Sequence, residues 1–179
     1  MEIEYYKKAF KETNDKKWIE WEHELSETST HCEVCQVLDK CWFLNSNKPA
    51  LPQHLNCHCK VSAIPPPIPG ETAEAFCPTE KFTGYIFSDK YAGNGKRDLF
   101  HHLGFTIKNA EELKAEFEKQ AVEKYTSGQY IRRKLDKYGQ NIDIEVTVLR
   151  KNQQPAKFIS GWKVRQKGRI TNNTPLGDN

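Results

Sequence analysis

The sequence predicts an α+β protein in which an N-terminal helix and a zinc knuckle precede a C-terminal domain of helices followed by a small antiparallel sheet. Three observations lead to this prediction. Aromatic residues recur at helical spacing near the N-terminus, four cysteines form two close pairs within residues 32–59, and apolar residues alternate with polar ones in the last third of the chain. A chain of 179 residues has room for one ordinary domain or two small ones.

The N-terminal segment predicts a helix over residues 3–28. Apolar residues recur there at steps of three, four and eight residues on a charged background. These residues are Tyr6, Phe10, Trp18, Trp21 and Leu25. The first ten residues lack the apolar core and the small-residue cleavage site of a secretory signal. We therefore expect a reducing compartment, where cysteines bind metal more often than they form disulfides.

The charge of the chain is unevenly distributed. Residues 1–79 contain 8 Lys/Arg and 12 Asp/Glu, a net charge of -4, whereas residues 80–179 contain 19 Lys/Arg and 12 Asp/Glu, a net charge of +7. A basic half fits a polyanionic partner such as nucleic acid, and it also fits a solvated surface. No run approaches the roughly 18 apolar residues of a membrane span, so we expect no membrane partner.

Two cysteine pairs and one histidine predict a zinc site. Two residues separate Cys32 from Cys35. About twenty residues later, His54 precedes Cys57 and Cys59. Zinc takes four tetrahedral ligands, so these five residues are candidates for four positions. Because the Cys-x-Cys pair is the less usual one, His54 is a candidate to replace one of its cysteines. Protein ligands at all four positions leave no place for water, so the expected ion is structural. The alternative is a set of free or buried cysteines.

Further motifs surround these ligands over about residues 15–64. They are Cys32-x2-Cys35, Val37-Leu38-Asp39, Trp42-Phe43 and Leu51-Pro52-x-His54-x-Asn56-Cys57-x-Cys59. Together they resemble the phage head-morphogenesis (minor capsid) family typified by the Mu F protein. The resemblance implies a prophage-encoded, capsid-associated protein with capsid or portal proteins as partners, located in the bacterial cytoplasm or in the phage virion. Lys40, Leu55 and His58 depart from the residues usual in that family.

A run of prolines predicts a boundary between two parts of the chain. Pro65, Pro66, Pro67 and Pro69 fix an extended backbone and remove hydrogen-bond donors, as in a semi-rigid spacer. We therefore expect three parts. They are a helix with a zinc-binding module over residues 1–64, a Pro-rich linker over 65–76, and a basic α+β domain over 77–179.

The basic part is predicted to contain helices first and strands afterwards. A short helix or strand is expected at residues 81–88, a short helix at 96–103, and a longer helix from 109 to about 126. Period-two alternation then predicts strands that short loops join into an antiparallel meander. The predicted strands are residues 129–136, 142–150, 156–166 and a last short one at 169–171.

Motifs in the basic part give a second, weaker resemblance. They are Gly93-x2-Lys96, Phe100, Leu103-Gly104-Phe105, Asp136-x2-Gly139 and Ser160-x-Trp162 with a closing threonine. The pattern resembles phage-associated polymorphic toxin domains, many of which resemble the barnase, EndoU, colicin and RelE group of small nucleases. This resemblance implies a metal-independent ribonuclease toxin, with RNA as substrate and an immunity protein as partner.

Such chemistry needs a base for the ribose 2′-hydroxyl, an acid for the leaving oxygen and cations on the phosphate. His101 or His102 is the candidate for proton transfer, but adjacent helical residues point about 100° apart, so only one can face a given site. Lys96 follows a glycine-bearing turn that offers backbone donors to a phosphate, and equally fits a tight turn with a solvated lysine. The remaining candidates are Arg132, Arg133 and Arg165 for the phosphate, and Ser160 or Thr171 as an additional hydrogen-bonding group.

Three functional hypotheses follow from these patterns. The first is a prophage-encoded head-morphogenesis-like protein whose basic C-terminal domain is a metal-independent ribonuclease-type toxin. The second is a non-enzymatic phage structural or accessory protein that binds nucleic acid or capsid proteins. The third is a plain nucleic-acid-binding module without a phage role.

Overall fold

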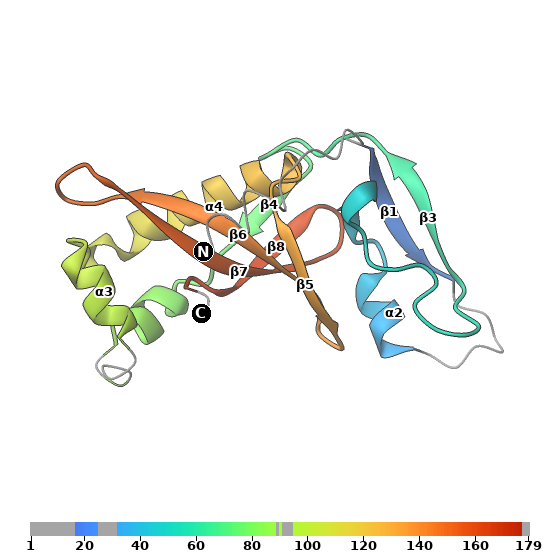
Figure 1. The fold of residues 1–179 in the computed structure, drawn as a ribbon, viewed down its shortest axis with the longest axis horizontal. Coiled ribbons are helices and arrows are strands. Elements are labelled where there is room, and N and C mark those ends of the chain that lie inside the picture. Colours follow the sequence, from blue (N-terminus) through green and yellow to red (C-terminus); the bar gives the residue numbers. More distant parts are fainter. Residues whose placement is uncertain (1–16, 25–31, 89, 91–94, 177–179) are drawn as a thin grey trace.

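The computed structural model describes residues 17–24, 32–88, 90 and 95–176 of the chain. The protein is α+β, with a three-stranded and a five-stranded sheet (Figure 1). The N-terminal part contains β1 (Trp18–His23), α2 (Glu33–Leu38), β2 (Trp42–Leu44), the 3₁₀ turn η1 (Asn45–Asn47) and β3 (Cys59–Ile64). The C-terminal part contains β4 (Glu74–Phe76), the π-helical turn η2 (Phe82–Ile86), α3 (Lys96–His102), the 3₁₀ turn η4 (Ile107–Asn109), α4 (Ala110–Thr126), β5 (Ile131–Asp136), β6 (Gly139–Leu149), β7 (Pro155–Val164) and β8 (Arg169–Thr174).

The three-stranded sheet corrects the predicted layout of a helix followed by a zinc knuckle. The prediction of a helix over residues 3–28 is wrong at Trp18–His23, which forms β1, the central strand between β2 and β3. Both neighbours pair with it antiparallel. The segment alternates Ile19 and Trp21 with Glu20 and Glu22, and this short aromatic run fits a strand once partners exist on both sides. Residues 3–16 and 25–28 of the predicted helix lie outside the described residues.

The five-stranded sheet has the order β4-β8-β7-β6-β5. Strands β5 to β8 form the antiparallel meander that the alternating pattern predicts. Strand β4 was not predicted, because it has only three residues and lies within the expected Pro-rich linker. It pairs parallel with β8, so strand pairing begins before the helices of the C-terminal part. The division into residues 1–64, 65–76 and 77–179 stays a prediction.

Helix α4 covers one face of the five-stranded sheet. Its buried residues are Ala110, Leu113, Phe117, Ala121 and Tyr125, which recur at helical spacing. They pack in one hydrophobic cluster with alternate residues of β6, namely Ile142, Ile144, Val146 and Val148. Helix α3 lies on the same side, because its Phe100 stacks on the buried Phe158 of β7 with ring centroids 5.1 Å apart. Most side chains on the opposite face of this sheet are polar.

One hydrophobic core joins the two parts of the chain. The ring of Trp18 in β1 meets the edge of Tyr125 in α4 at a centroid distance of 5.3 Å. The Tyr125 hydroxyl donates to the backbone carbonyl of Trp42 at 2.6 Å, and Asn47 donates to the carbonyl of Tyr130 at 3.1 Å. The N-terminal part therefore closes one end of the large sheet (Figure 1). Among the described residues, no helix combines the length and apolar character needed to span a membrane.

Candidate metal centre and the open face of the large sheet

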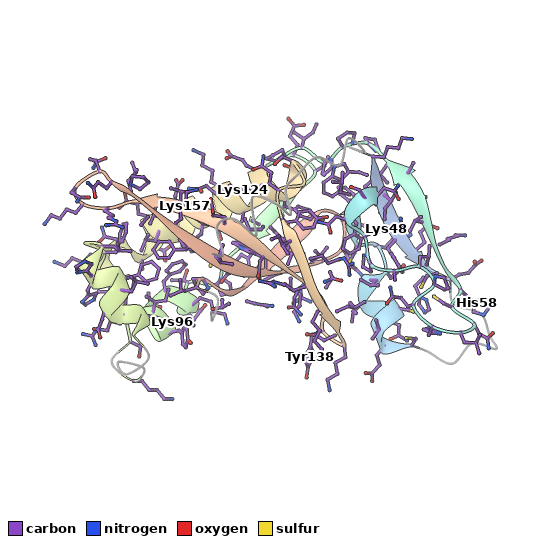
Figure 2. The ribbon with its side chains drawn as sticks, viewed as in Figure 1. Lys48, His58, Lys96, Lys124, Tyr138 and Lys157 are labelled. Carbon is purple, nitrogen blue, oxygen red and sulfur yellow. The ribbon has the colours of Figure 1, made fainter. Side chains whose placement is uncertain are left out.

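The predicted zinc ligands come from three neighbouring segments of the N-terminal part. Cys32 and Cys35 lie at the start and in the first turns of α2. His54 and Cys57 lie in the loop before β3, and Cys59 is the first residue of β3. Figure 2 shows sulfur atoms between α2 and this loop, near the label of His58, which is itself exposed. The local fold therefore brings the two cysteine pairs together from opposite sides of a small space.

The distances agree with a metal centre. The Cys35 Sγ lies 3.3 Å from the His54 Nε2 and 3.9 Å from the Cys57 Sγ. The ligand atoms of Cys32, Cys35 and His54 all lie within 4.8 Å of one another. Zinc bonds of about 2.3 Å to sulfur and 2.0–2.1 Å to nitrogen, at tetrahedral angles, place ligand atoms about 3.5–3.8 Å apart. These groups are close enough to hold a metal ion.

A sixth donor, His23, joins the five predicted ones. It ends β1 and pairs in register with Cys59 of β3. Its Nδ1 lies 3.6 Å from the Cys59 Sγ, and the ligand atoms of His23, Cys35 and Cys59 lie within 4.8 Å of one another. The prediction of a helix concealed His23, because only the antiparallel register of β1 and β3 places it opposite a cysteine. Correct strand assignment is the signal that would have found it.

The electrostatics of the cluster favour a cation. Burial, together with the neighbouring thiols of Cys59 and Cys32, raises the pKa of Cys35. Burial also opposes ionisation of Cys57, but backbone hydrogen bonds at Gln53 and Cys59 outweigh it and lower the pKa of that thiol to about 7. A bound cation would favour the ionised form of both Cys35 and Cys57, because a metal stabilises a thiolate directly.

The two remaining cysteines stand apart from the cluster. Cys41 and Cys77 are fully buried in the hydrophobic core. The Cys41 thiol lies 3.4 Å from the carbonyl of Val37, to which it donates. Burial raises the pKa of each of these two thiols to about 12. They therefore behave as apolar core residues.

The face of the five-stranded sheet opposite α4, here called the open face, carries an ordered polar cluster. Its residues alternate in the strands with buried ones, and they are Arg133, Asp136, Asn141, Asp143, Lys163, Arg165, Thr171 and Asn173. The Lys163 Nζ lies 3.1 Å from the Asp136 Oδ1. Asn141 donates to the Asp136 Oδ2 at 3.0 Å and accepts from Asn173 at 2.9 Å. Four strands thus contribute to a single hydrogen-bonded group.

A comparison with known families assigns the part of the chain that contains this sheet to a family. A family model described as Domain of unknown function (DUF6883) matches residues 69–173, which is more than half of the chain. The chain belongs to the DUF6883 family. No curated protein and no solved structure matches it. The matched residues begin before β4 and end in β8, so the DUF6883 part contains the large sheet with its helices, whereas the metal centre lies outside it.

The predicted catalytic residues of the DUF6883 part fall into two separate groups. Lys96, His101 and His102 are on α3, on the covered side of the sheet, whereas Arg133 and Thr171 belong to the open face. The predicted phosphate-binding turn before Lys96 is only partly visible, because residues 91–94 lie outside the described residues. The fold therefore does not bring the five predicted residues into one site.

The residues on α3 have structural contacts. The Lys96 Nζ donates to the carbonyl of Leu176 at 3.1 Å and to the hydroxyl of Tyr85 at 3.3 Å. His101 is exposed and stacks on Phe87 with ring centroids 6.0 Å apart. His102 is exposed as well. Lys96 therefore ties α3 to the chain beyond β8, which differs from the free cation that phosphate binding would require.

The residues on the open face are arranged differently. The Arg133 Nε pairs with the Asp143 Oδ2 at 2.6 Å, and the Arg165 Nε donates to the Thr171 Oγ1 at 3.3 Å. Beside Arg165 and Thr171 a cavity of about 810 Å³ opens at the β4 edge of the sheet. Its lining includes Gln36, Glu74, Phe76, Lys114, Arg165 and Thr171. Thr171 and Arg165 thus belong both to the open face and to this cavity.

Proposed function

We propose that this chain is a two-part, prophage-encoded protein in which a structural zinc centre orders the N-terminal part and the DUF6883 part cleaves RNA without a metal. The observation that supports RNA as the substrate is the meeting of Asp136, Lys163, Arg165 and Thr171 on the open face. The head-morphogenesis-like role of the N-terminal part, with capsid or portal partners, belongs to the same proposal.

The zinc part of the proposal has support from the donor set. Cysteine thiolates and histidine nitrogens are the ligands that structural zinc sites use. The donors come from α2, β1 and the loop before β3, so an ion would tie together segments that are otherwise short and irregular. The alternative of free thiols requires several buried or half-buried cysteines within 4.8 Å of histidine nitrogens and of each other without a ligand. Elemental analysis of the purified full-length protein separates the two.

The ribonuclease part assigns a role to each group of the open face. Asn141, the backbone N–H of Tyr138 and Lys163 hydrogen-bond to the Asp136 carboxylate. An ionised Asp136 takes the proton of the ribose 2′-hydroxyl, whose oxygen attacks the phosphorus. The 5′-oxygen leaves with a proton from the Lys163 ammonium, and a 2′,3′-cyclic phosphate forms. Arg165 and Thr171 stabilise the charge on the phosphate oxygens.

An exposed aromatic ring next to this cluster fits an RNA strand. Tyr138 lies in the turn between β5 and β6, and 62% of it is exposed. Figure 2 labels it at the tip of that turn. Its ring is 5.4 Å from the Lys163 Nζ, and the Arg165 guanidinium donates to its carbonyl at 2.9 Å. Bases of single-stranded RNA stack on such rings beside cations.

The test is an RNA-cleavage assay with the full-length protein, run with and without a chelator. We expect cleavage that survives chelation and falls more than tenfold in Asp136→Asn and in Arg165→Ala. Lys157→Ala is the matched control. Lys157 lies on β7, as Lys163 does, but its Nζ pairs with Glu145 at 2.9 Å, away from the cluster. A large loss in the His101→Ala/His102→Ala double variant, with Asp136→Asn unaffected, would return the chemistry to α3.

The non-enzymatic alternative has one observation in its favour, which is the structural engagement of Lys96 in α3. It predicts that the protein binds RNA or DNA in a gel-shift assay and leaves the nucleic acid uncut. It also predicts that expression in bacteria does not arrest growth. Intact RNA after long incubation with well-folded protein would decide for this binding function.

A further inference from the structure

We propose that the Cys/His cluster holds two zinc ions rather than one, with His23 as a ligand of the second ion. This inference rests on the proposed zinc centre and specifies its composition. Cys32 and His54 are terminal ligands of one ion, and Cys59 and His23 are terminal ligands of the other. The thiolates of Cys35 and Cys57 bridge the two ions.

The grouping of the donor atoms carries the first step. Among the described residues, two sets of three donors lie within 4.8 Å of one another, and the only member that they share is Cys35. One set extends towards His54 in the loop, and the other towards His23 in β1. A single tetrahedral ion takes four ligands at mutual distances of about 3.5–3.8 Å. Two sets that overlap in one thiol correspond instead to two adjacent ions with a shared ligand.

The number of donors carries the second step. Six cysteine and histidine side chains surround this space, and one ion would leave two of them unused. Four terminal and two bridging ligands give each of two ions four bonds. The Cys35 and Cys57 sulfur atoms lie 3.9 Å apart, close to the separation of two sulfurs on one zinc ion. They are therefore placed to share both ions.

Charge balance favours the same composition. Four thiolates carry four negative charges, and two zinc ions carry four positive charges, so the complete centre is neutral. A centre without net charge avoids the cost of burying a charge beside Cys35, which is fully buried.

The histidine itself supplies an independent sign. The Nε2 of His23 is buried and has no hydrogen-bond partner, although its backbone N–H donates to the Asp39 Oδ1 at 2.9 Å. A buried polar nitrogen without a partner costs free energy, and such groups in native proteins require an explanation. A metal bond to the Nε2 would give this atom the partner that it lacks, and it would fix the tautomer and orientation of the ring.

The test measures the zinc-to-protein ratio of the purified full-length chain by elemental analysis after dialysis against zinc-containing and then zinc-free buffer. We expect two zinc ions per chain in the wild type and one in His23→Ala. His58→Ala is the matched control, because His58 lies between Cys57 and Cys59 but is exposed, and it should keep both ions. The ¹¹³Cd NMR spectrum of the cadmium-substituted wild type should contain two resonances, which keeps the test valid if His23→Ala does not fold.

Each other result overturns a defined part of the proposal. A ratio of one with a single ¹¹³Cd resonance removes the second ion and leaves the structural zinc site standing. A ratio near zero with all thiols free removes both. A ratio of two that His23→Ala leaves unchanged removes His23 from the ligand set.

Discussion

The carboxylate of Asp136, on the open face, accepts hydrogen bonds from three neighbouring groups. Burial opposes its ionisation, but hydrogen bonds from Asn141, the backbone N–H of Tyr138 and Lys163 outweigh burial and lower its pKa. A group whose pKa is lowered on folding stabilises the native state above its unfolded pKa. This contribution disappears as the pH falls through the folded pKa, which for Asp136 lies below the ordinary pKa of an aspartate.

Asp136→Asn should therefore lower the free energy of unfolding at pH 7 by on the order of 1 kcal/mol, because the ionic hydrogen bonds are lost. The difference between wild type and variant should shrink at pH 3 and vanish below the folded pKa. Urea unfolding at pH 7, pH 3 and pH 2 measures this difference in unfolding free energy. Asp98→Asn, at an exposed position of α3, is the control and should change stability little at any of them. A variant that differs equally from the wild type at pH 7 and at pH 2 would contradict this account.

Single residues also show how far sequence patterns reach into the candidate sites. The spacing of Cys32, Cys35, His54, Cys57 and Cys59 was sufficient to gather the metal donors, because close pairs stay close in any local fold. His23 was missed because its place opposite Cys59 depends on strand register. Lys163 was missed as a site residue because alternation marks a strand but does not reveal which residues of three other strands lie beside it.

Among the described glycines, Gly168 in the β7–β8 turn has the least space for a Cβ atom. Gly168 has a φ of +72°, and a Cβ on it would lie 2.5 Å from the carbonyl oxygen of Thr72 and 2.7 Å from the ring of Trp42. The turn therefore packs against both the N-terminal part and the segment before β4. Gly70 has a similar φ of +76°, but a Cβ there would meet nothing within 4 Å.

The two glycines form a matched pair for substitution. Gly70→Ala should cost about 1–2 kcal/mol of unfolding free energy, since only the left-handed backbone is unfavourable for alanine. Gly168→Ala should cost at least twice as much, because backbone and an aromatic ring must move as well. Thermal unfolding monitored by circular dichroism compares them. Equal losses in the two variants would show that the contacts around Gly168 yield easily.

Elements were predicted well where one face of a long segment is buried, and poorly elsewhere. Helix α4 and the meander β5 to β8 have enough residues for their period to be unambiguous. Strand β1 has six residues with aromatics three apart, which fits helix and strand equally until β2 and β3 are known to flank it. Strand β4 has three residues and exists only because β8 offers an edge.

At the scale of the whole molecule, the shared core couples the N-terminal part, with its Cys/His cluster, to the DUF6883 part. Trp18 and Trp42 contact Tyr125 of α4, and the backbone N–H of Lys167 donates to the carbonyl of Lys40 at 2.7 Å. Loss of order in the N-terminal part would uncover buried aromatic surface at the end of the large sheet. Sequence patterns indicated two parts, but they carried no sign of these contacts, which join residues 83 to 127 positions apart.

Chelation should therefore lower the melting temperature of the entire protein in a single transition. In each condition, far-UV circular dichroism and tryptophan fluorescence should report the same midpoint as each other, because both parts unfold together. This common midpoint should be lower with chelator than without it. His58→Ala should respond to the chelator as the wild type does. Two transitions, with only the first sensitive to chelator, would show that the parts are energetically independent.

The position of β5 at the rim of the large sheet has a consequence for self-association. Its outer backbone groups are unpaired by any other strand of the described sheet, and such edges recruit further strands in aggregates. Arg132, Arg133 and Lys134 follow one another on this strand and are all exposed. A second copy that added its own β5 there would align like charges at close range. These three cations, of which Arg132 and Arg133 were candidate phosphate ligands, therefore disfavour pairing of two copies through this edge.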